Sequence, residues 1–96
     1  MLFKSKELVY TYTMVEPSGV FNTGDEVTLS TLDDYLKVTA DNKRQWILYY
    51  HHITKVEYSN KIMKISYLNS LKQEHIFVVE DPTGKGKKLA NRLKNK

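Results

Sequence analysis

Residues 75–93 read HIFVVEDPTGKGKKLANRL, an apolar run followed by a loop of glycines and lysines and then by a segment with helical spacing. β-Branched and aromatic residues dominate the first part, which is typical of a strand. In the last part, Leu89, Ala90 and Leu93 recur on one helical face. The stretch therefore predicts a final strand that leads into a C-terminal helix over about residues 82–95.

The residues before this helix carry start signals. Asp81 or Thr83 can cap its free N–H groups, and Pro82 suits a first turn. Gly86 lies one turn before the apolar residues on the same face, where a missing side chain lets the helix lie close to other backbone. We expect the helix to close the mouth of a small barrel, with about 1.5–3 kcal/mol from the burial of each leucine.

Upstream of the helix, period-two alternation of apolar and polar residues predicts strands from about residue 6 to residue 80. Turn residues recur roughly every ten positions, which is typical of an antiparallel meander. Within one segment, Ile53 and Val56 break the alternation, so we expect a β-bulge or a bent strand there. The predicted strand segments are ELVYTYTMV (7–15), EVTLST (26–31), DYLKVTA (34–40), RQWILYY (44–50), HITKVEY (52–58), KIMKISYL (61–68) and LKQEHIFVVE (71–80).

The length and composition limit which classes of protein the chain can belong to. The chain of 96 residues fits one domain spanning residues 1–96, and it contains no cysteine, which excludes disulfides and thiolate nucleophiles. The first residues lack the long apolar core of a secretion signal, and no stretch approaches the roughly 20 apolar residues of a membrane span. We therefore expect a cytoplasmic protein.

The net charge of +4 is unevenly placed. Residues 1–84 carry a small excess of acidic side chains, whereas no acid follows residue 84. A nucleic-acid binder more often spreads its cations over the docking face. The cations of the C-terminal segment are Lys85, Lys87, Lys88, Arg92, Lys94 and Lys96.

The order of these elements resembles the pleckstrin-homology-like superfold. The run WILYYHHITKVEYSNKIMKISYLN (46–69), followed by residues 75–93, looks like the small bacterial and GRAM-type members of that superfold. The pattern covers roughly residues 25–93. The resemblance implies an all-β fold with one C-terminal helix, namely a seven-stranded antiparallel barrel or orthogonal sandwich capped by the helix. It also implies a module that binds lipid headgroups, peptides or proteins and is not an enzyme.

Lipid-binding members of the superfold grip phosphates with cations in the loop between the first two strands. Here the corresponding loop, residues 16–26, has no cation and carries Glu16, Asp25 and Glu26. This difference argues against phosphoinositide binding by that route. The tryptophan usual in the helix of eukaryotic members is also missing, which favours the bacterial or GRAM-like variant.

Motifs for catalysis, metals or nucleotides are weak. The segment TGKGKK lacks the spacing and the hydroxyl of a phosphate-binding loop. His51 and His52 are adjacent on an extended chain and His75 is distant, so a metal site is disfavoured. Asp33 and Asp34 alternate in direction, and no oriented nucleophile accompanies them. We therefore expect no cofactor, no metal and no catalytic residues.

Aromatic residues are the unusual feature. The chain has seven tyrosines and one tryptophan, too many polar rings for one small core. Exposed Tyr and Trp are favoured anchors in protein interfaces, although tyrosine is also a good residue for the outside of a sheet. The candidate partner-binding residues are Tyr35, Trp46, Tyr49 and Tyr50.

The sequence thus favours a small non-catalytic binding module, a protein–protein interaction domain or modulator from a bacterium or phage. The alternative is that the basic C-terminal helix binds an anionic membrane surface or nucleic acid. In that case Lys85, Lys87, Lys88 and Arg92 would make the contacts, and affinity would fall steeply with added salt.

Overall fold

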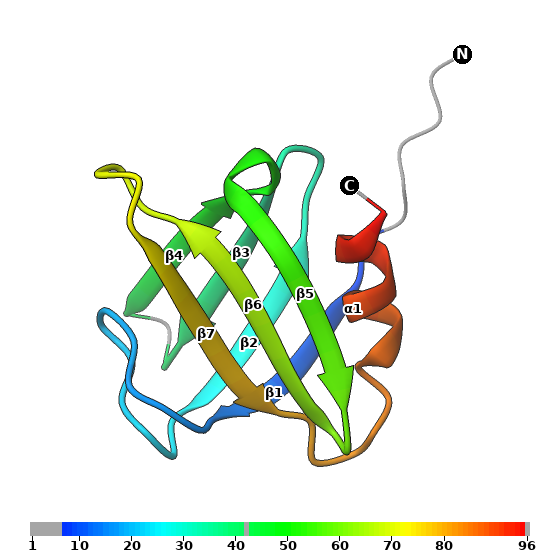
Figure 1. Ribbon diagram of the computed structural model, residues 1–96. Helices are drawn as coiled ribbons and strands as arrows, with labels where there is room; N and C mark the ends of the chain where they lie inside the picture. Colours follow the sequence, from blue (N-terminus) through cyan, green and yellow to red (C-terminus); the bar gives the residue numbers. More distant parts are fainter. Residues whose placement is uncertain (1–6, 42, 96) are drawn as a thin grey trace.

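The computed structural model describes residues 7–41 and 43–95, which form seven strands, a short 3-10 turn and one α-helix (Figure 1). The expected strand start near residue 6, the turn residue Asn42 and the cation Lys96 lie outside the described residues. The elements are β1 (Val9–Met14), β2 (Glu26–Thr31), β3 (Tyr35–Ala40), β4 (Arg44–Tyr49), η1 (Tyr50–His52), β5 (Ile53–Ser59), β6 (Ile62–Leu68), β7 (Glu74–Glu80) and α1 (Lys87–Lys94).

All seven strands belong to one antiparallel sheet in the order β4-β3-β2-β1-β7-β6-β5. Two meanders, β1 to β4 and β5 to β7, join where β1 pairs with β7 at only two positions, Thr13 with Glu80 and Met14 with Val79. The sheet bends so that the two meanders face one another across the core (Figure 1). The all-β class with one C-terminal helix, expected from the sequence, is confirmed.

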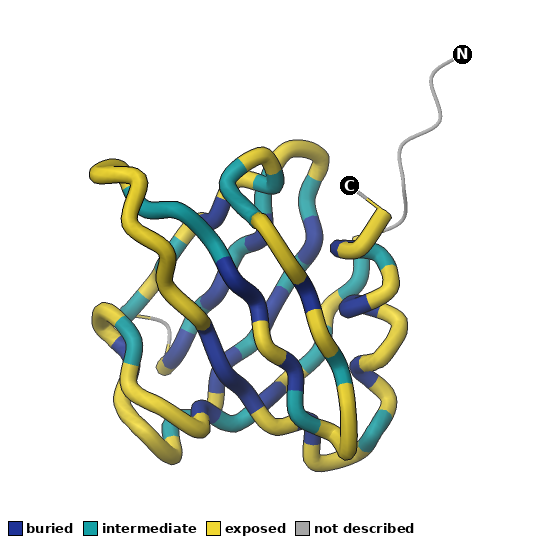
Figure 2. Tube along the Cα trace, viewed as in Figure 1, coloured by how far each residue is buried: buried dark blue, intermediate teal, exposed yellow. Residues whose placement is uncertain are grey.

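The core lies on the inner face of this bent sheet, and the buried positions are spread over the strands and α1 (Figure 2). The alternation expected for β2 and β3 is confirmed, because every second residue of these strands is buried. In β1, Tyr12 and Met14 are buried and Tyr10, on the same face, is partly buried. The loop after β1 adds a further core residue, Phe21. The largest fully buried side chains are Tyr12, Met14, Phe21, Val27, Leu29, Leu36, Val38, Met63, Ile65, Phe77, Val79 and Leu89.

Helix α1 packs beside β5 and covers one end of the bent sheet (Figure 1). Its apolar face is buried as expected, with Leu89, Ala90 and Leu93 all inside the core cluster. The approach is close at Gly86, whose carbonyl oxygen accepts a hydrogen bond of 2.9 Å from the buried Tyr12 hydroxyl. The lysines of α1, Lys87, Lys88 and Lys94, are exposed, whereas Arg92 is half-buried.

The helix begins at Lys87, five residues later than the sequence predicts. Residues 82–86 form turns instead, because the buried Asp81 carboxylate binds the N–H of Gly86 at 2.7 Å rather than capping a helix at residue 82. The Thr83 hydroxyl donates to the same carboxylate at 3.3 Å and accepts from the N–H of Lys85 at 3.2 Å. The predicted capping residues thus organise the connecting loop.

The expected irregularity of β5 is confirmed by a register shift between Ile53 and Lys55. The hairpin after β5 turns at Asn60 and Lys61, both with positive φ (52° and 65°), one residue later than the Ser59–Asn60 tip that the sequence suggests. Positive φ at both central residues is the geometry of a type I′ turn, which matches the twist of the flanking strands.

The contacts around Asp81 predict how stability responds to alkaline pH. Burial and the hydrogen bond to Asp81, at 2.7 Å, raise the pKa of the Tyr58 phenol from 10.0 to about 12. Burial, with the nearby charge of Asp81, also raises the pKa of Tyr12. Since the folded pKa lies above the unfolded pKa of about 10, this stabilisation is complete below about pH 10 and is lost as pH rises toward 12.

We therefore expect the urea midpoint of unfolding to fall between about pH 10 and pH 12. The Tyr58→Phe variant is the control, since it has no phenol to ionise at this position and should show a shallower fall over the same range. An equal slope in both proteins would contradict this role of Tyr58.

Candidate partner-binding surface

Two tyrosines meet on the outer face of β3 and β4. Tyr35 pairs with Tyr49, and Lys37 pairs with Ile47, at directly opposite positions of the two strands. The rings of Tyr35 and Tyr49 make an edge contact with their centroids 5.7 Å apart. Ile47 and Tyr49 are 37% and 45% exposed, so β4 presents neighbouring apolar and aromatic side chains outside the core. We call Tyr35, Ile47 and Tyr49 the β4 surface.

The other two candidates, Trp46 and Tyr50, lie on the opposite face. The Trp46 ring packs against Tyr67 and Phe77, with centroids 5.0 and 5.3 Å away. The Tyr50 hydroxyl donates a hydrogen bond of 2.5 Å to the Leu32 carbonyl, and its ring packs on the core. The four candidate residues therefore do not form one surface, because alternation along β4 sends Trp46 inward and Tyr49 outward.

Two histidines extend the β4 surface at the end of β4. The ring of Tyr49 lies 5.9 Å from that of His51 and 6.3 Å from that of His52, and the two imidazoles are 4.3 Å apart. They are this close because residues 50–52 form a 3-10 turn and not the extended chain that is expected from the sequence. Within residues 7–41 and 43–95, no group of three or more His, Cys, Asp or Glu is arranged to hold a metal ion.

At the other end of β4, a basic depression of about 320 Å³ lies between Lys37, Thr39, Lys43, Arg44 and Gln45. Among the described residues, Lys37 and Lys43 have no carboxylate partner, whereas Arg44 has two. The two ends of β4 therefore differ in character, one being cationic and the other aromatic.

Arg44 joins the loop after β1 to the β3–β4 hairpin. Its guanidinium donates to Asp25 at 2.6 Å, to the Val20 carbonyl at 3.0 Å and to Asp41 at 2.8 Å. The pKa of Asp25 is lowered by the N–H of Asn22 and by Arg44, and the pKa of Asp41 is lowered mainly by Arg44. Sequence reasoning missed this cluster because its members are far apart in the chain.

The cations of the C-terminal segment are only partly equivalent. Lys85, Lys87 and Lys88 are exposed, whereas Arg92 is half-buried against the body of the protein. The four residues named for an anionic partner thus comprise three solvated lysines and one arginine that takes part in intramolecular contacts.

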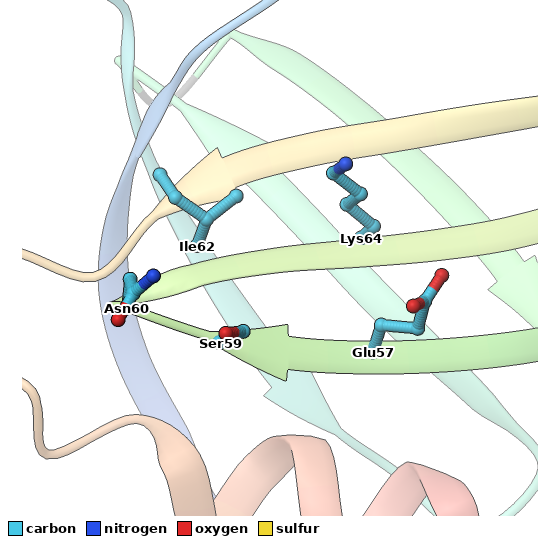
Figure 3. Close-up of a pocket in the computed structure, with 5 residues that line it drawn as sticks. All are labelled: Glu57, Ser59, Asn60, Ile62 and Lys64. Atoms are coloured by element: carbon cyan, nitrogen blue, oxygen red, sulfur yellow. The ribbon is translucent and has the colours of Figure 1, made fainter.

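A second depression, of about 300 Å³, lies on the outer face of β5 and β6. Figure 3 shows Ile62 and Lys64 projecting from β6, and Glu57 from β5. Glu57 forms an ion pair of 3.5 Å with Lys55, and Lys64 stands directly opposite Glu57. Charges of both signs on adjacent strands make this face nearly neutral, so it favours no ligand of a particular charge.

Comparison with models of known protein families finds no match, and comparison with curated proteins finds none either. In the part of the chain that the structure describes, no helix is long and apolar enough to cross a membrane.

Proposed function

We propose that the chain is a non-catalytic binding module of pleckstrin-homology-like type that recognises another protein through the β4 surface. The order of seven antiparallel strands followed by one helix supports the superfold assignment. The proposal for the site rests on the exposure of Ile47 and Tyr49, which lie on a strand at the edge of the sheet. The ring of Tyr49 is in contact with that of Tyr35.

The energetics of tyrosine favour this use. A tyrosine buries a large area at low entropic cost, and one that is already packed against a neighbour loses little further freedom on binding. Tyr35 restrains Tyr49 in this way before any partner arrives. The adjacent Ile47 adds apolar area, so the β4 surface combines an aromatic anchor with an aliphatic one.

The groups with shifted pKa values support a non-catalytic role. The hydroxyls of Tyr12 and Tyr50 bind backbone carbonyls, and that of Tyr58 binds a carboxylate. Asp25 and Asp41 both bind Arg44. Each of these groups thus has a structural partner, whereas acid–base catalysis needs a titratable group that is paired with a nucleophile.

Replacing Tyr49 by alanine is expected to weaken partner binding by about 30-fold or more, because truncating an aromatic anchor typically costs about 2 kcal/mol or more. The wild type and Tyr49→Ala would be immobilised, exposed to a lysate of the native host, and the captured proteins compared by mass spectrometry. Leu71→Ala is the matched control, since Leu71 is 75% exposed in the β6–β7 loop and is not part of the β4 surface. A captured protein retained equally by all three would contradict the proposal.

The basic segment provides the rival function. Lys85, Lys87 and Lys88 all point into solvent, as a surface for anionic lipid or nucleic acid requires. Two separate probes test this function: vesicles that contain phosphatidylserine, and a DNA duplex. Tight binding that falls steeply with salt, and that is lost when these lysines and Arg92 are changed to glutamine, would favour the rival over the β4 surface.

A further inference from the structure

The two edges of the sheet are protected to different degrees. Edge strand β5 carries Lys55 and Glu57 outward, contains the register shift after Ile53, and lies beside α1. Charges, bulges and covering helices are the usual devices that stop an edge from pairing with another chain. Edge strand β4 has a continuous register with β3 over all of Arg44–Tyr49, with no proline and no bulge.

The hydrogen-bond pattern identifies the backbone groups that β4 leaves open. The N–H of Tyr50 donates to the Asp34 carbonyl at 3.2 Å, so Tyr50 and Asp34, one position beyond the paired ends of β4 and β3, form a hydrogen-bonded pair. Antiparallel pairs alternate, and therefore Leu48, Trp46 and Arg44 also bond to β3. The N–H and C=O groups of the three residues between them, Gln45, Ile47 and Tyr49, point away from β3 toward the free edge.

These three residues are symmetric about Ile47. If a second β4 strand adds in antiparallel orientation, Ile47 of each chain lies opposite Ile47 of the other, and Gln45 lies opposite Tyr49 in both directions. Each of the three residues can then exchange backbone hydrogen bonds with its counterpart. Their side chains share the outer face, so the isoleucines would form an apolar cross-strand pair.

The charges also favour an antiparallel second copy. At the start of β4, Arg44 is ion-paired with Asp25 and Asp41, and Lys43 has no carboxylate partner among the described residues, which leaves its positive charge unpaired. At the other end, the exposed Asp34 precedes Tyr35. Antiparallel addition brings the cationic end of one chain toward the acidic end of the other. Parallel addition would bring like charges together, which costs free energy.

We propose that the chain forms a symmetric dimer by antiparallel pairing of β4 with β4 of a second copy, with Ile47 on the twofold axis. The pairing extends the sheet from one chain into the next and sets the two β4 surfaces side by side. The dimer goes beyond the proposed function and does not depend on it. If both hold, one dimer presents a doubled aromatic face to its partner.

The oligomeric state of the full chain tests the dimer by sedimentation equilibrium over a range of concentrations. The wild type should be a dimer that dissociates on dilution. Ile47→Lys and Ile47→Glu should each be monomeric, because like charges would meet on the axis, and an equimolar mixture of the two should regain a dimer. The mixture regains a dimer only if residue 47 of one chain lies opposite residue 47 of the other, because lysine then meets glutamate.

The matched control is Ile76→Lys, which places the same charge on the outer face of the interior strand β7, where Ile76 is 51% exposed. It should leave the dimer intact. In hydrogen exchange, the amides of Gln45, Ile47 and Tyr49 should become protected as protein concentration rises, whereas those of Trp46 and Leu48 should be protected throughout.

A wild type that stays monomeric at every concentration would overturn the dimer, as would an Ile47→Lys variant that stays dimeric or a mixture that fails to pair. None of these results depends on partner capture. Conversely, if the Tyr49→Ala variant captured its partner as well as the wild type does, the proposed function would be contradicted but the dimer would not. The failure of one proposal can therefore be told from the failure of the other.

Discussion

Replacing Gly86 by alanine is expected to lower the free energy of unfolding by about 2–4 kcal/mol, because the new methyl group overpacks a full core and disturbs a buried hydrogen bond. A Cβ at this position would lie 2.3 Å from the hydroxyl oxygen of Tyr12 and 2.6 Å from the ring carbon that bears it. Tyr12 is fully buried, so its ring cannot move aside into solvent. Urea unfolding of the wild type and Gly86→Ala measures the loss.

Two controls separate the clash from the hydrogen bond. Tyr12→Phe removes only the bond to the Gly86 carbonyl and should cost about 1 kcal/mol. In a Tyr12→Leu background the ring is absent, so adding Gly86→Ala should cost much less than it does in the wild type. If the cost of Gly86→Ala were the same in both backgrounds, Tyr12 would not be the group that it meets.

Replacing Leu89 by alanine should lower the free energy of unfolding by about 2–5 kcal/mol, the range for truncating a buried leucine. Leu89 is fully buried between α1 and the sheet. Alanine is the best helix former, so the loss reports packing and not the intrinsic stability of the helix. Thermal unfolding followed by far-ultraviolet circular dichroism gives the change.

The neighbouring Lys88 offers the matched control, because it is exposed on the same helix turn. Lys88→Ala should change the free energy of unfolding by no more than about 0.5 kcal/mol. Equal effects of the two substitutions would mean that α1 is not held to the sheet through Leu89.

The strands and the apolar face of the helix could be predicted from the sequence because both are local. Period-two alternation places every second residue of a strand on one face, and in β2 and β3 the residues of one face, among them Val27 and Leu36, are buried. The odd spacing of Ile53 and Val56 indicated the irregularity in β5, since an extra residue shifts every later side chain to the other face. Such patterns need no knowledge of what lies across the core.

The start of the helix could not be predicted in the same way. Asp81 and Thr83 are good capping residues in isolation, but the Asp81 carboxylate also receives the hydroxyl of Tyr58, 23 residues earlier in the chain. This long-range contact holds Asp81 next to β5, and the chain turns until Gly86 before the helix begins. A tertiary contact thus overrode a local preference.

The candidate site was only partly accessible to sequence reasoning. Alternation separated Trp46 and Tyr50 from Tyr49, but it could not show which face was outside. That depends on the far meander, where Tyr67 and Phe77 receive the Trp46 ring. The open edge of β4 likewise follows from the strand order, which places β4 at one end of the sheet.

The affinity of the purified captured protein for three forms of the chain, measured by calorimetry at low and high salt, tests the role of the β4 surface most directly. The forms are the wild type, Tyr49→Ala, and a variant with Lys85, Lys87, Lys88 and Arg92 all changed to glutamine. We predict that Tyr49→Ala loses about 30-fold or more in affinity while the glutamine variant stays close to the wild type. The opposite ranking, with affinity lost in the glutamine variant and retained in Tyr49→Ala, would contradict it.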